Sequence, residues 1–542
     1  MAETILYAAR RIITMEPTQP YATHVAVRDG RILAVGGPEI AEVWGGARLD
    51  ERFRDQVLLP GFVEAHSHMM TGALWTYLYC GNVDRTDPDG NLWPGVHTVD
   101  DMIDRMKGAI AKLPAGQPLV CWGFDPLFFA GDRLNRHHLD QASAEVPIAV
   151  MHQSFHLMTV NSKALEMAGY GPDTNAEGVV RLPDGSLMGE LQEMGAMFPV
   201  MRRLNMAIRD ISKGEHAIVQ YGKAAVQTGV TTATDLMADL ADDDVATLLD
   251  VTGRKDYPLR LVPALGVIGL EPKAAAARAL ELRAKSTDML RMGICKVMTD
   301  GSIQGFTARV KWPGYIGGQP NGLWNLEPAR LKELVKTLHA SGLNMQVHTN
   351  GDEASDFILD CFEEAMWEHP TGDSRHTLQH CQMAGEDQFY RAARLGVCVN
   401  LFANHLWYYG DAHAEFTVGP DRAARMNACR SALDNGVTLA IHSDSPVTPL
   451  GPLHVAWCAV NRITPKGRVL GANQRLSVME ALHAITLGAA RTLKLDREVG
   501  SITPGKAADF AVLGDDPLSL APEALRDIPV LGTVQGGRVF VK

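Results

Sequence analysis

Short apolar runs recur along the middle of the chain, and stretches with helical spacing separate them. Such a run, bounded by turn residues, is typical of a buried strand. The segments 328–342 and 386–396 are amphipathic and predict helices between two such strands. Eight strand candidates follow in order, at 57–66, 229–236, 259–265, 293–300, 343–350, 375–382, 396–405 and 436–444. This alternation predicts an α/β fold closed as a TIM (β/α)8 barrel.

The structural alternative is a doubly wound open sheet. No G-x-G-x-x-G motif follows a strand candidate in this sequence, so the signature that such a sheet uses for dinucleotides is missing. The barrel is therefore the preferred interpretation.

Both ends of the chain have short strands and tight turns instead of helical spacing. Asp29-Gly30 lies between two apolar runs and predicts a hairpin. Because chain ends often lie close together, we expect the two ends to pair into one composite β domain. The expected boundaries are 1–58 and 496–542 for the β domain, 59–69 and 226–495 for the barrel, and 70–225 for an insertion. The insertion follows the first barrel strand and is expected to cap the active site.

Composition narrows the class of protein. The 542 residues carry a net charge of -12, which argues against nucleic acid and anionic membranes as partners. Eight scattered cysteines without a C-x-x-C pair suit reduced thiols, and the first residues show no signal-peptide pattern. We therefore expect a cytoplasmic protein with a small-molecule substrate, and a homo-oligomer, with a dimer as the first guess.

Candidate metal ligands lie at the ends of the predicted strands. His66 and His68 alternate on the first strand, which would point both imidazoles to one side. The remaining candidates lie in or after later strands: Lys296, His348, His380 and Asp444. The carboxyl ends of TIM-barrel strands form the active-site face, so the pattern predicts a metal centre there.

Lys296 is the unusual member, because an ammonium group cannot bind a metal. Burial near cations lowers a lysine pKa, and the neutral amine can add carbon dioxide to give a carbamate that bridges two ions. The alternative is a salt bridge from Lys296 to Asp300 or Asp444. The residues alone leave both open.

Six motifs resemble the amidohydrolase superfamily, and more closely its YtcJ-like branch, the amidohydrolase family 3 type. They are GFVEAHSH (61–68), CKVMTDGS (295–302), VHTNGD (347–352), RHTLQH (375–380), HSDSPV (442–447) and GSITPGKAADFAVL (500–513). The resemblance implies a distorted barrel beside a composite β-sandwich. It implies that His66 and His68 bind one ion and that His348 and His380 bind a second. It further implies two divalent ions, with zinc as the expected metal, bridged by a carboxylated Lys296, and Asp444 as ligand and proton carrier.

Two positions depart from the pattern of this branch. Phe306 stands before Thr307-Ala308, where an arginine is usual. His442 stands two residues before Asp444, where a glycine is commoner. Both departures bear on substrate recognition more than on metal binding.

Substrate contacts are predicted from two regions. His156 and Asn161 lie in the insertion, as does Glu193, which supports a metal, contacts substrate or is a solvated helix carboxylate. Phe402, His405 and Trp407 follow the seventh strand. This aromatic run indicates an apolar or aromatic side to the substrate.

The predicted function is hydrolysis of a non-peptide C–N bond, such as that of an N-acyl or N-formyl amine, by a metal-bridged hydroxide. The alternatives are a mononuclear deaminase of a cyclic amidine and an ester or lactone hydrolase. A non-catalytic barrel scaffold is a remote alternative, since a scaffold has no chemical need for the full ligand set.

Overall fold

The computed structural model describes residues 3–44, 46–129, 131, 133–206 and 212–542. The chain divides into two compact units. Unit 1 combines Met1–His68 with Gly222–Lys542, and unit 2 is Met69–Tyr221. The predicted domain ranges also include residues 1–2, 45, 130, 132 and 207–211, which lie outside the described residues.

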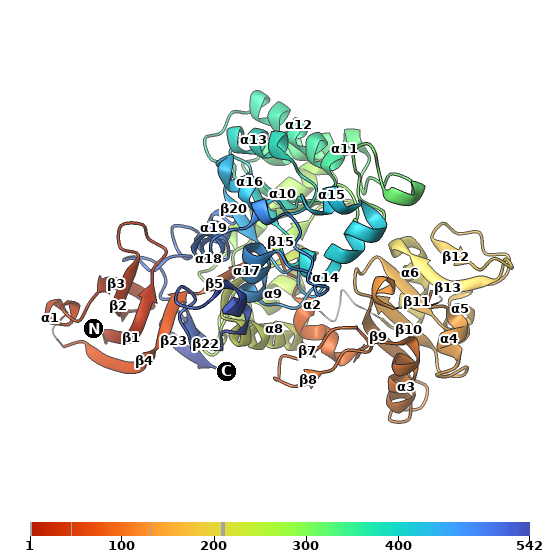
Figure 1. The fold of residues 1–542 in the computed structure, drawn as a ribbon, viewed down its shortest axis with the longest axis horizontal. Helices are drawn as coiled ribbons and strands as arrows, with labels where there is room; N and C mark the ends of the chain where they lie inside the picture. Colours follow the sequence, from red (N-terminus) through yellow and green to blue (C-terminus); the bar gives the residue numbers. More distant parts are fainter. Residues whose placement is uncertain (1–2, 45, 130, 132, 207–211) are drawn as a thin grey trace. The chain divides into compact units, whose positions relative to one another are not determined.

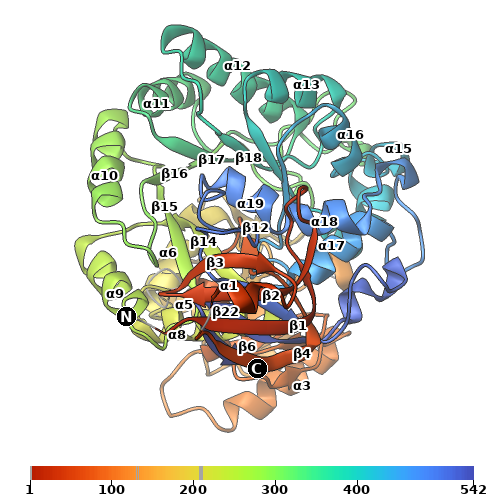
Figure 2. The same ribbon diagram turned by 90° about the vertical axis from the view of Figure 1, so that its left-hand side faces the viewer.

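Unit 1 contains a curled parallel sheet of eight strands within the described residues (Figures 1 and 2). In spatial order they are β5 (Phe62–Glu64), β14 (Val230–Ala238), β15 (Arg260–Gly266), β16 (Ile294–Met298), β17 (Asn344–Thr349), β18 (Thr377–His380), β19 (Cys398–Leu401) and β20 (Leu439–Ile441). Six of the eight strands lie within a predicted segment, and β14 and β15 extend beyond theirs by two residues and one residue. The two edge strands approach each other beyond their ends, where Ser67 and Ser445 form a parallel bridge. The α/β fold with a curled eight-stranded sheet is therefore confirmed.

Helices cover the outer side of this sheet, and Figure 2 shows α9 to α13 along its periphery. The two predicted helices form as α11 and α13; Glu327 caps α11 by accepting from the Arg330 N–H, and α13 buries Phe389 and Ala392. The helices of this part are α8 (Glu215–Thr228, across the division between units), α9 (Asp242–Thr252), α10 (Pro272–Ala284), α11 (Pro328–Ala340), α12 (Asp352–Glu368), α13 (Glu386–Arg394), α14 (His405–Ala412), α15 (Pro420–Ala423), α16 (Cys429–Asp434), α17 (Pro452–Asn461), α18 (Val478–Ala484) and α19 (Leu487–Thr492).

The two ends of the chain meet in a second sheet of unit 1. Its order is β23-β22-β21-β4-β1-β2-β3. The strands are β1 (Ile5–Ile13), β2 (Tyr21–Arg28), β3 (Arg31–Gly36), β4 (Arg48–Pro60), β21 (Phe510–Leu513), β22 (Val530–Gln535) and β23 (Arg538–Val541), with α1 at Ile40–Val43. The Asp29-Gly30 turn has positive φ at both residues, as a tight hairpin between β2 and β3 requires. Pairing of β21 with β4 joins the C-terminal strands to the N-terminal ones. The description of this domain as a sandwich remains a prediction.

Unit 2 is built around a sheet ordered β12-β13-β11-β10-β9-β6 (Figure 1). Its strands are β6 (Leu78–Tyr79), β9 (Leu119–Phe124), β10 (Ile148–His152), β11 (Leu157–Val160), β12 (Val179–Arg181) and β13 (Leu187–Gln192), and a separate pair is β7 (Arg85–Thr86) with β8 (Leu92–Trp93). The helices are α2 (Met70–Ala73), α3 (Val99–Ile110), α4 (Arg136–Asp140), α5 (Ser162–Ala168) and α6 (Glu193–Arg203). Two apolar clusters, one with Trp122 and Met151 and one with Cys121 and Val150, form its core. Over the described part of the chain, no helix has both the length and the apolar character that a bilayer crossing needs.

Candidate metal centre

The predicted ligands of unit 1 gather at the carboxyl end of the curled sheet. Lys296 lies in β16, His348 in β17 and His380 at the end of β18. His66 and His68 follow β5, which ends at Glu64, so the expected alternation along a strand is wrong in detail. Backbone contacts hold the two histidines instead: the N–H of His68 donates to the Ser445 carbonyl (2.8 Å), and the His66 carbonyl accepts from the Asp444 N–H (3.0 Å).

Asp444 joins both histidines of the first strand. Its Oδ1 lies 3.3 Å from Nε2 of His66 and 3.3 Å from Nε2 of His68. The three side chains thus present two nitrogens and one oxygen to a common point, in a group that has the size of a metal site. Two imidazoles and a carboxylate are the donors that zinc and related ions prefer.

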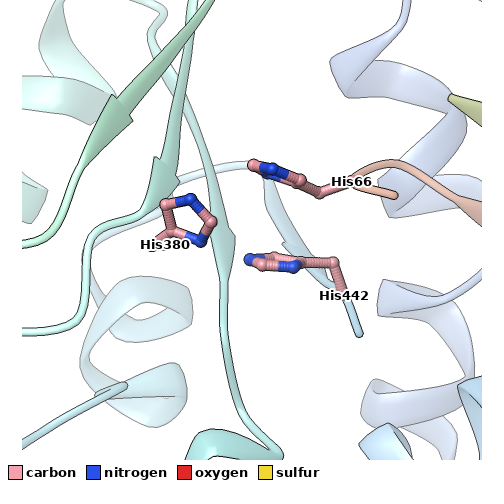
Figure 3. A group of neighbouring side chains, drawn as sticks. All are labelled: His66, His380 and His442. Atoms are coloured by element: carbon pink, nitrogen blue, oxygen red, sulfur yellow. The ribbon is translucent and has the colours of Figure 1, made fainter. Parts of the chain in front are cut away.

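A second group shares His66 and adds His380 and His442 (Figure 3). One ring nitrogen of each lies within 4.8 Å of the other two. The His442 ring stacks on His66, with centroids 4.7 Å apart and an interplanar angle of 22°, and lies edge-on to His380 at 5.0 Å. From the sequence, His442 was noted only as a departure from the family pattern and was not predicted to be a metal ligand.

The His66 ring is oriented from behind by an amide. Its Nδ1 lies 2.7 Å from Oε1 of Gln379, which also accepts from Nδ2 of Asn400 at 2.9 Å. Nε2 of Gln379 donates in turn to Oε1 of Gln346. Because an amide oxygen only accepts, Nδ1 of His66 must carry the proton, and Nε2 keeps its lone pair toward the site.

Lys296 is 2% exposed, and its Nζ lies 3.4 Å from Nε2 of His66. Burial lowers the pKa of this amine to about 7, although attraction to Asp444 acts in the opposite direction. Among the described residues neither Asp300 nor Asp444 lies within ion-pair distance of Nζ, so the salt-bridge alternative does not form here. A substantial neutral fraction of this amine is therefore expected near neutral pH.

His348 is turned partly away from the two groups. Its Nε2 lies 3.2 Å from the Gly301 carbonyl and 3.3 Å from Nδ2 of Asn350. Its ring is nevertheless 4.7 Å from that of His380, at an interplanar angle of 73°. The structure thus keeps His348 beside His380 without bringing it into either three-residue group.

The ionisation of the site suits a cation. Burial lowers the pKa of His442 to about 3 and lowers those of His66 and His380 well below the ordinary value, so these imidazoles are neutral. Burial acts to raise the pKa of Asp444, but contact with His68 and nearby positive charges outweigh it and the pKa is lowered. Neutral imidazoles beside an ionised carboxylate are the protonation states that metal binding requires.

Unpartnered nitrogens test whether these residues fit a metal. Within the described residues, Nδ1 of His380 and both ring nitrogens of His442 are buried without a hydrogen-bond partner. Leaving such a group unsatisfied costs about 1–3 kcal/mol. A bound divalent ion would satisfy the lone pairs, so the donor set fits a metal.

Two further features support the site and were missed by sequence reasoning. Glu64 accepts from N and Oγ of Ser443, at 3.1 and 2.9 Å, which ties β5 to the loop that carries Asp444; burial raises the Glu64 pKa to about 8. His380 and Asp444 have φ of 70° and 52°, in the left-handed region that non-glycine residues rarely adopt. Strained backbone of this kind is concentrated at functional sites.

The candidates of the insertion lie in unit 2. Nδ1 of His156 lies 3.1 Å from Oε2 of Glu193, the first residue of α6, so the two predicted residues form a pair. Asn161 caps α5: its Oδ1 accepts from the N–H groups of Ala164 and Ile148, and its Nδ2 donates to two carbonyls. The amide of Asn161 is fully used by these four bonds, and its role here is structural.

The aromatic run after β19 divides into two parts. Phe402 is 3% exposed and stacks on His442 at 4.7 Å, and His405 packs against Phe402 at 4.8 Å. Trp407, on α14, contacts Trp457 and His454, and Arg526 lies 4.7 Å above its ring. Phe402 and His405 therefore border the imidazole cluster, whereas the described ring contacts of Trp407 are with residues outside it.

A curled parallel sheet with imidazoles, a lysine and a carboxylate at its carboxyl end defines a candidate metal-dependent enzyme. The chain belongs to the amidohydrolase family, whose family model matches residues 54–541. The predicted enzyme class, an amidohydrolase acting on C–N bonds, is confirmed at this level.

Three relatives align over almost the whole chain. Protein LONG AFTER FAR-RED 3 of Arabidopsis thaliana is 28% identical, over 97% of this chain and 90% of its own length. Putative amidohydrolase YtcJ of Bacillus subtilis (strain 168) is 26% identical over 95% of both chains. N-substituted formamide deformylase of Arthrobacter pascens is 24% identical over 97% of this chain and 96% of its own. The resemblance to the YtcJ-like branch is thereby confirmed.

The fold also resembles solved structures. An uncharacterized metal-dependent hydrolase from Pyrococcus horikoshii OT3 superposes with a TM-score of 0.73, covering 96% of this chain and 99% of that one, at 19% identity. At this identity the likeness supports the fold alone.

Proposed function

We propose that this amidohydrolase uses divalent metal ions, zinc in the first place, to cleave a non-peptide C–N bond of a small molecule. The observation that carries the proposal is the convergence of imidazole nitrogens on the carboxylate of Asp444 at the carboxyl end of the sheet. For the substrate class we propose an N-acyl or N-formyl amine. Support comes from the alignment with the formamide deformylase over nearly its full length.

In this proposal His66, His68 and Asp444 hold one ion, and His348 and His380 hold the other. Lys296, as a carbamate formed with carbon dioxide, would bridge them. Two features of the lysine favour this role: its Nζ is 3.4 Å from Nε2 of His66, and its pKa near 7 provides the neutral amine that reacts with carbon dioxide.

When bound, the ions would polarise a carbonyl oxygen and lower the pKa of water. Asp444 would accept the proton that the water loses and later pass it to the departing nitrogen. Its position supports this role, because Oδ1 lies at equal distance from two of the proposed ligand nitrogens. Its lowered pKa keeps the carboxylate ready to accept.

The border of the site supports an apolar group on the substrate. Phe402 stacks on His442, His405 packs against Phe402, and both are almost fully buried. We propose that an apolar or aromatic group of the substrate lies toward this side. His156 and Glu193 are proposed as further substrate contacts on the basis of their pairing in the insertion.

The test is a screen of N-formyl, N-acyl, cyclic amide and ester substrates with the zinc-loaded and the metal-depleted chain. Hydrolysis of amides that disappears on chelation and returns with zinc supports the proposal. One ion per chain, with no effect of Lys296→Ala, would instead favour a mononuclear deaminase. A stable metal-free chain that hydrolyses nothing would favour a scaffold.

A further inference from the structure

His442 is packed between two rings, and its ring nitrogens have the features of a metal ligand. It is fully buried at the end of the curled sheet, directly after β20. Its ring is held on one side by His66 and on the other by Phe402, at centroid distances of 4.7 Å in both cases and interplanar angles of 22° and 28°. This stacking fixes the plane of the ring and so fixes where its nitrogens lie.

Two other pairs of buried histidines in this part of the chain have a partner for at least one ring nitrogen of each residue. His339 and His376 share a hydrogen bond of 2.9 Å, and His405 and His413 share one of 3.0 Å. For His442, by contrast, the described residues offer no hydrogen-bond partner to either nitrogen. A buried polar group without a partner indicates an unseen ligand at that point.

The neighbours of the His442 ring indicate that its unseen partner is a metal ion. One of its nitrogens lies within 4.8 Å of a nitrogen of His66 and of His380, and Nδ1 of His380 is also unpartnered among the residues described. Imidazole nitrogens this close together form a nitrogen-rich donor set, which suits zinc, iron, copper or nickel and not magnesium or calcium.

We propose that His442 is a metal ligand of this chain, on the ion that the proposed function gives to His380. This inference rests on the proposed function, because the ion it contacts is one of those that the hydrolase uses. It adds a ligand outside the six that the sequence predicted.

The test compares His442→Phe with the unchanged full-length chain. Phenylalanine keeps the aromatic stacking on His66 and Phe402 and removes both nitrogens. We expect zinc affinity, measured by competition with a chromophoric chelator, to fall at least tenfold at the affected site. The cobalt(II) visible spectrum should change at the same time, because one nitrogen donor is lost.

His454→Phe is the matched control. His454 also stacks on an aromatic ring, that of Trp457, but it lies outside the group of His66, His380 and His442. It should bind zinc as the unchanged chain does. Should His442→Phe fold poorly, a crystal structure of the unchanged chain at the zinc absorption edge decides. Anomalous density within bonding distance of a His442 nitrogen supports the inference.

The outcomes separate this inference from the proposed function. If the unchanged chain binds zinc and hydrolyses amides while His442→Phe keeps its zinc affinity and spectrum, only the role of His442 is wrong. Zinc density out of bonding distance of His442 gives the same answer. If the unchanged chain binds no divalent metal, the proposed function fails together with the inference.

Discussion

Nδ1 of His66 lies 2.7 Å from Oε1 of Gln379, and this contact sets the proton on the far side of the imidazole from the site. Gln379 is in register with His348 and Asn400 on the neighbouring strands, so strand pairing places the amide behind the ligands. The sheet therefore positions a ligand and also the group that fixes the tautomer of that ligand.

Gln379→Met is predicted to weaken metal binding without removing a ligand. Methionine has a similar length but cannot accept the Nδ1–H of His66, so the ring loses its fixed orientation. Loss of such a supporting hydrogen bond typically costs 10–100-fold in metal affinity. Chelator competition with zinc measures the change.

Gln388→Met is the control for this variant. Gln388 is also buried, but it donates to the Asp352 carbonyl and to Asp356 on α12, away from the ligands. It should leave zinc affinity unchanged. Equal zinc affinity in Gln379→Met and the unchanged chain would contradict the orienting role.

Asp444→Asn is predicted to keep much of the metal and lose most of the turnover. Asparagine retains an oxygen for the ion but cannot take up a proton near neutral pH. General acid–base groups typically contribute about 10²–10⁴-fold to rate, so kcat should fall by this order. Metal analysis and kcat on the same preparation check both parts, and near-normal kcat would show that another group moves the proton.

Lys296→Ala is predicted to remove one of the two ions and, with it, most of the activity. The unchanged chain, grown or incubated with ¹³C-bicarbonate, should show a carbamate carbon in its ¹³C spectrum, and the variant should not. Lys506→Ala is the control, because Lys506 is a second buried lysine that contacts Ser501 and not the ligands. Two ions per chain in Lys296→Ala would contradict the bridging role.

The order of the barrel strands could be predicted from sequence because each strand is a short apolar run between turns. All eight strands formed at the predicted segments, with β14 and β15 extending one or two residues beyond theirs, and the two predicted helices became α11 and α13. The end of β5 was misjudged, since His66 and His68 continue the alternating pattern while backbone bonds to the loop after β20 hold them in place. The hydrophobic pattern of the first strand carries no information about the loop after β20, which is more than 370 residues away in the chain.

The same limit applies to the site. Residue type and strand position identified His66, His68, His380 and Asp444 as candidates, and the structure brings these side chains together. The sequence did not identify His442 as their neighbour. Only the structure shows that this ring stacks on His66 and that its nitrogens have no hydrogen-bond partner within the described residues. Left-handed backbone at His380 and Asp444 likewise has no signature in residue type.

Asp509→Ala is predicted to destabilise unit 1 far from the ligands. Nη1 of Arg260, in the first position of β15, lies 2.6 Å from Oδ2 of Asp509, and both side chains are less than a tenth exposed. Oδ1 of Asp509 also accepts from the Gly536 N–H at 2.7 Å, so the pair joins the curled sheet to the C-terminal strands. Removing one partner leaves a buried charge, which typically costs about 3–5 kcal/mol.

The midpoint of urea unfolding measures this loss of stability. Two further variants show whether the loss comes from the unpaired buried charge. Arg254→Ala breaks an exposed pair with Asp250 on the surface and should cost less than about 1 kcal/mol. Replacing both buried partners, Arg260→Met with Asp509→Leu, should recover much of the stability that Asp509→Ala loses, because no charge then stays buried alone. If the double variant is as unstable as Asp509→Ala, the loss comes from the Gly536 hydrogen bond and local packing and not from the charge on Arg260.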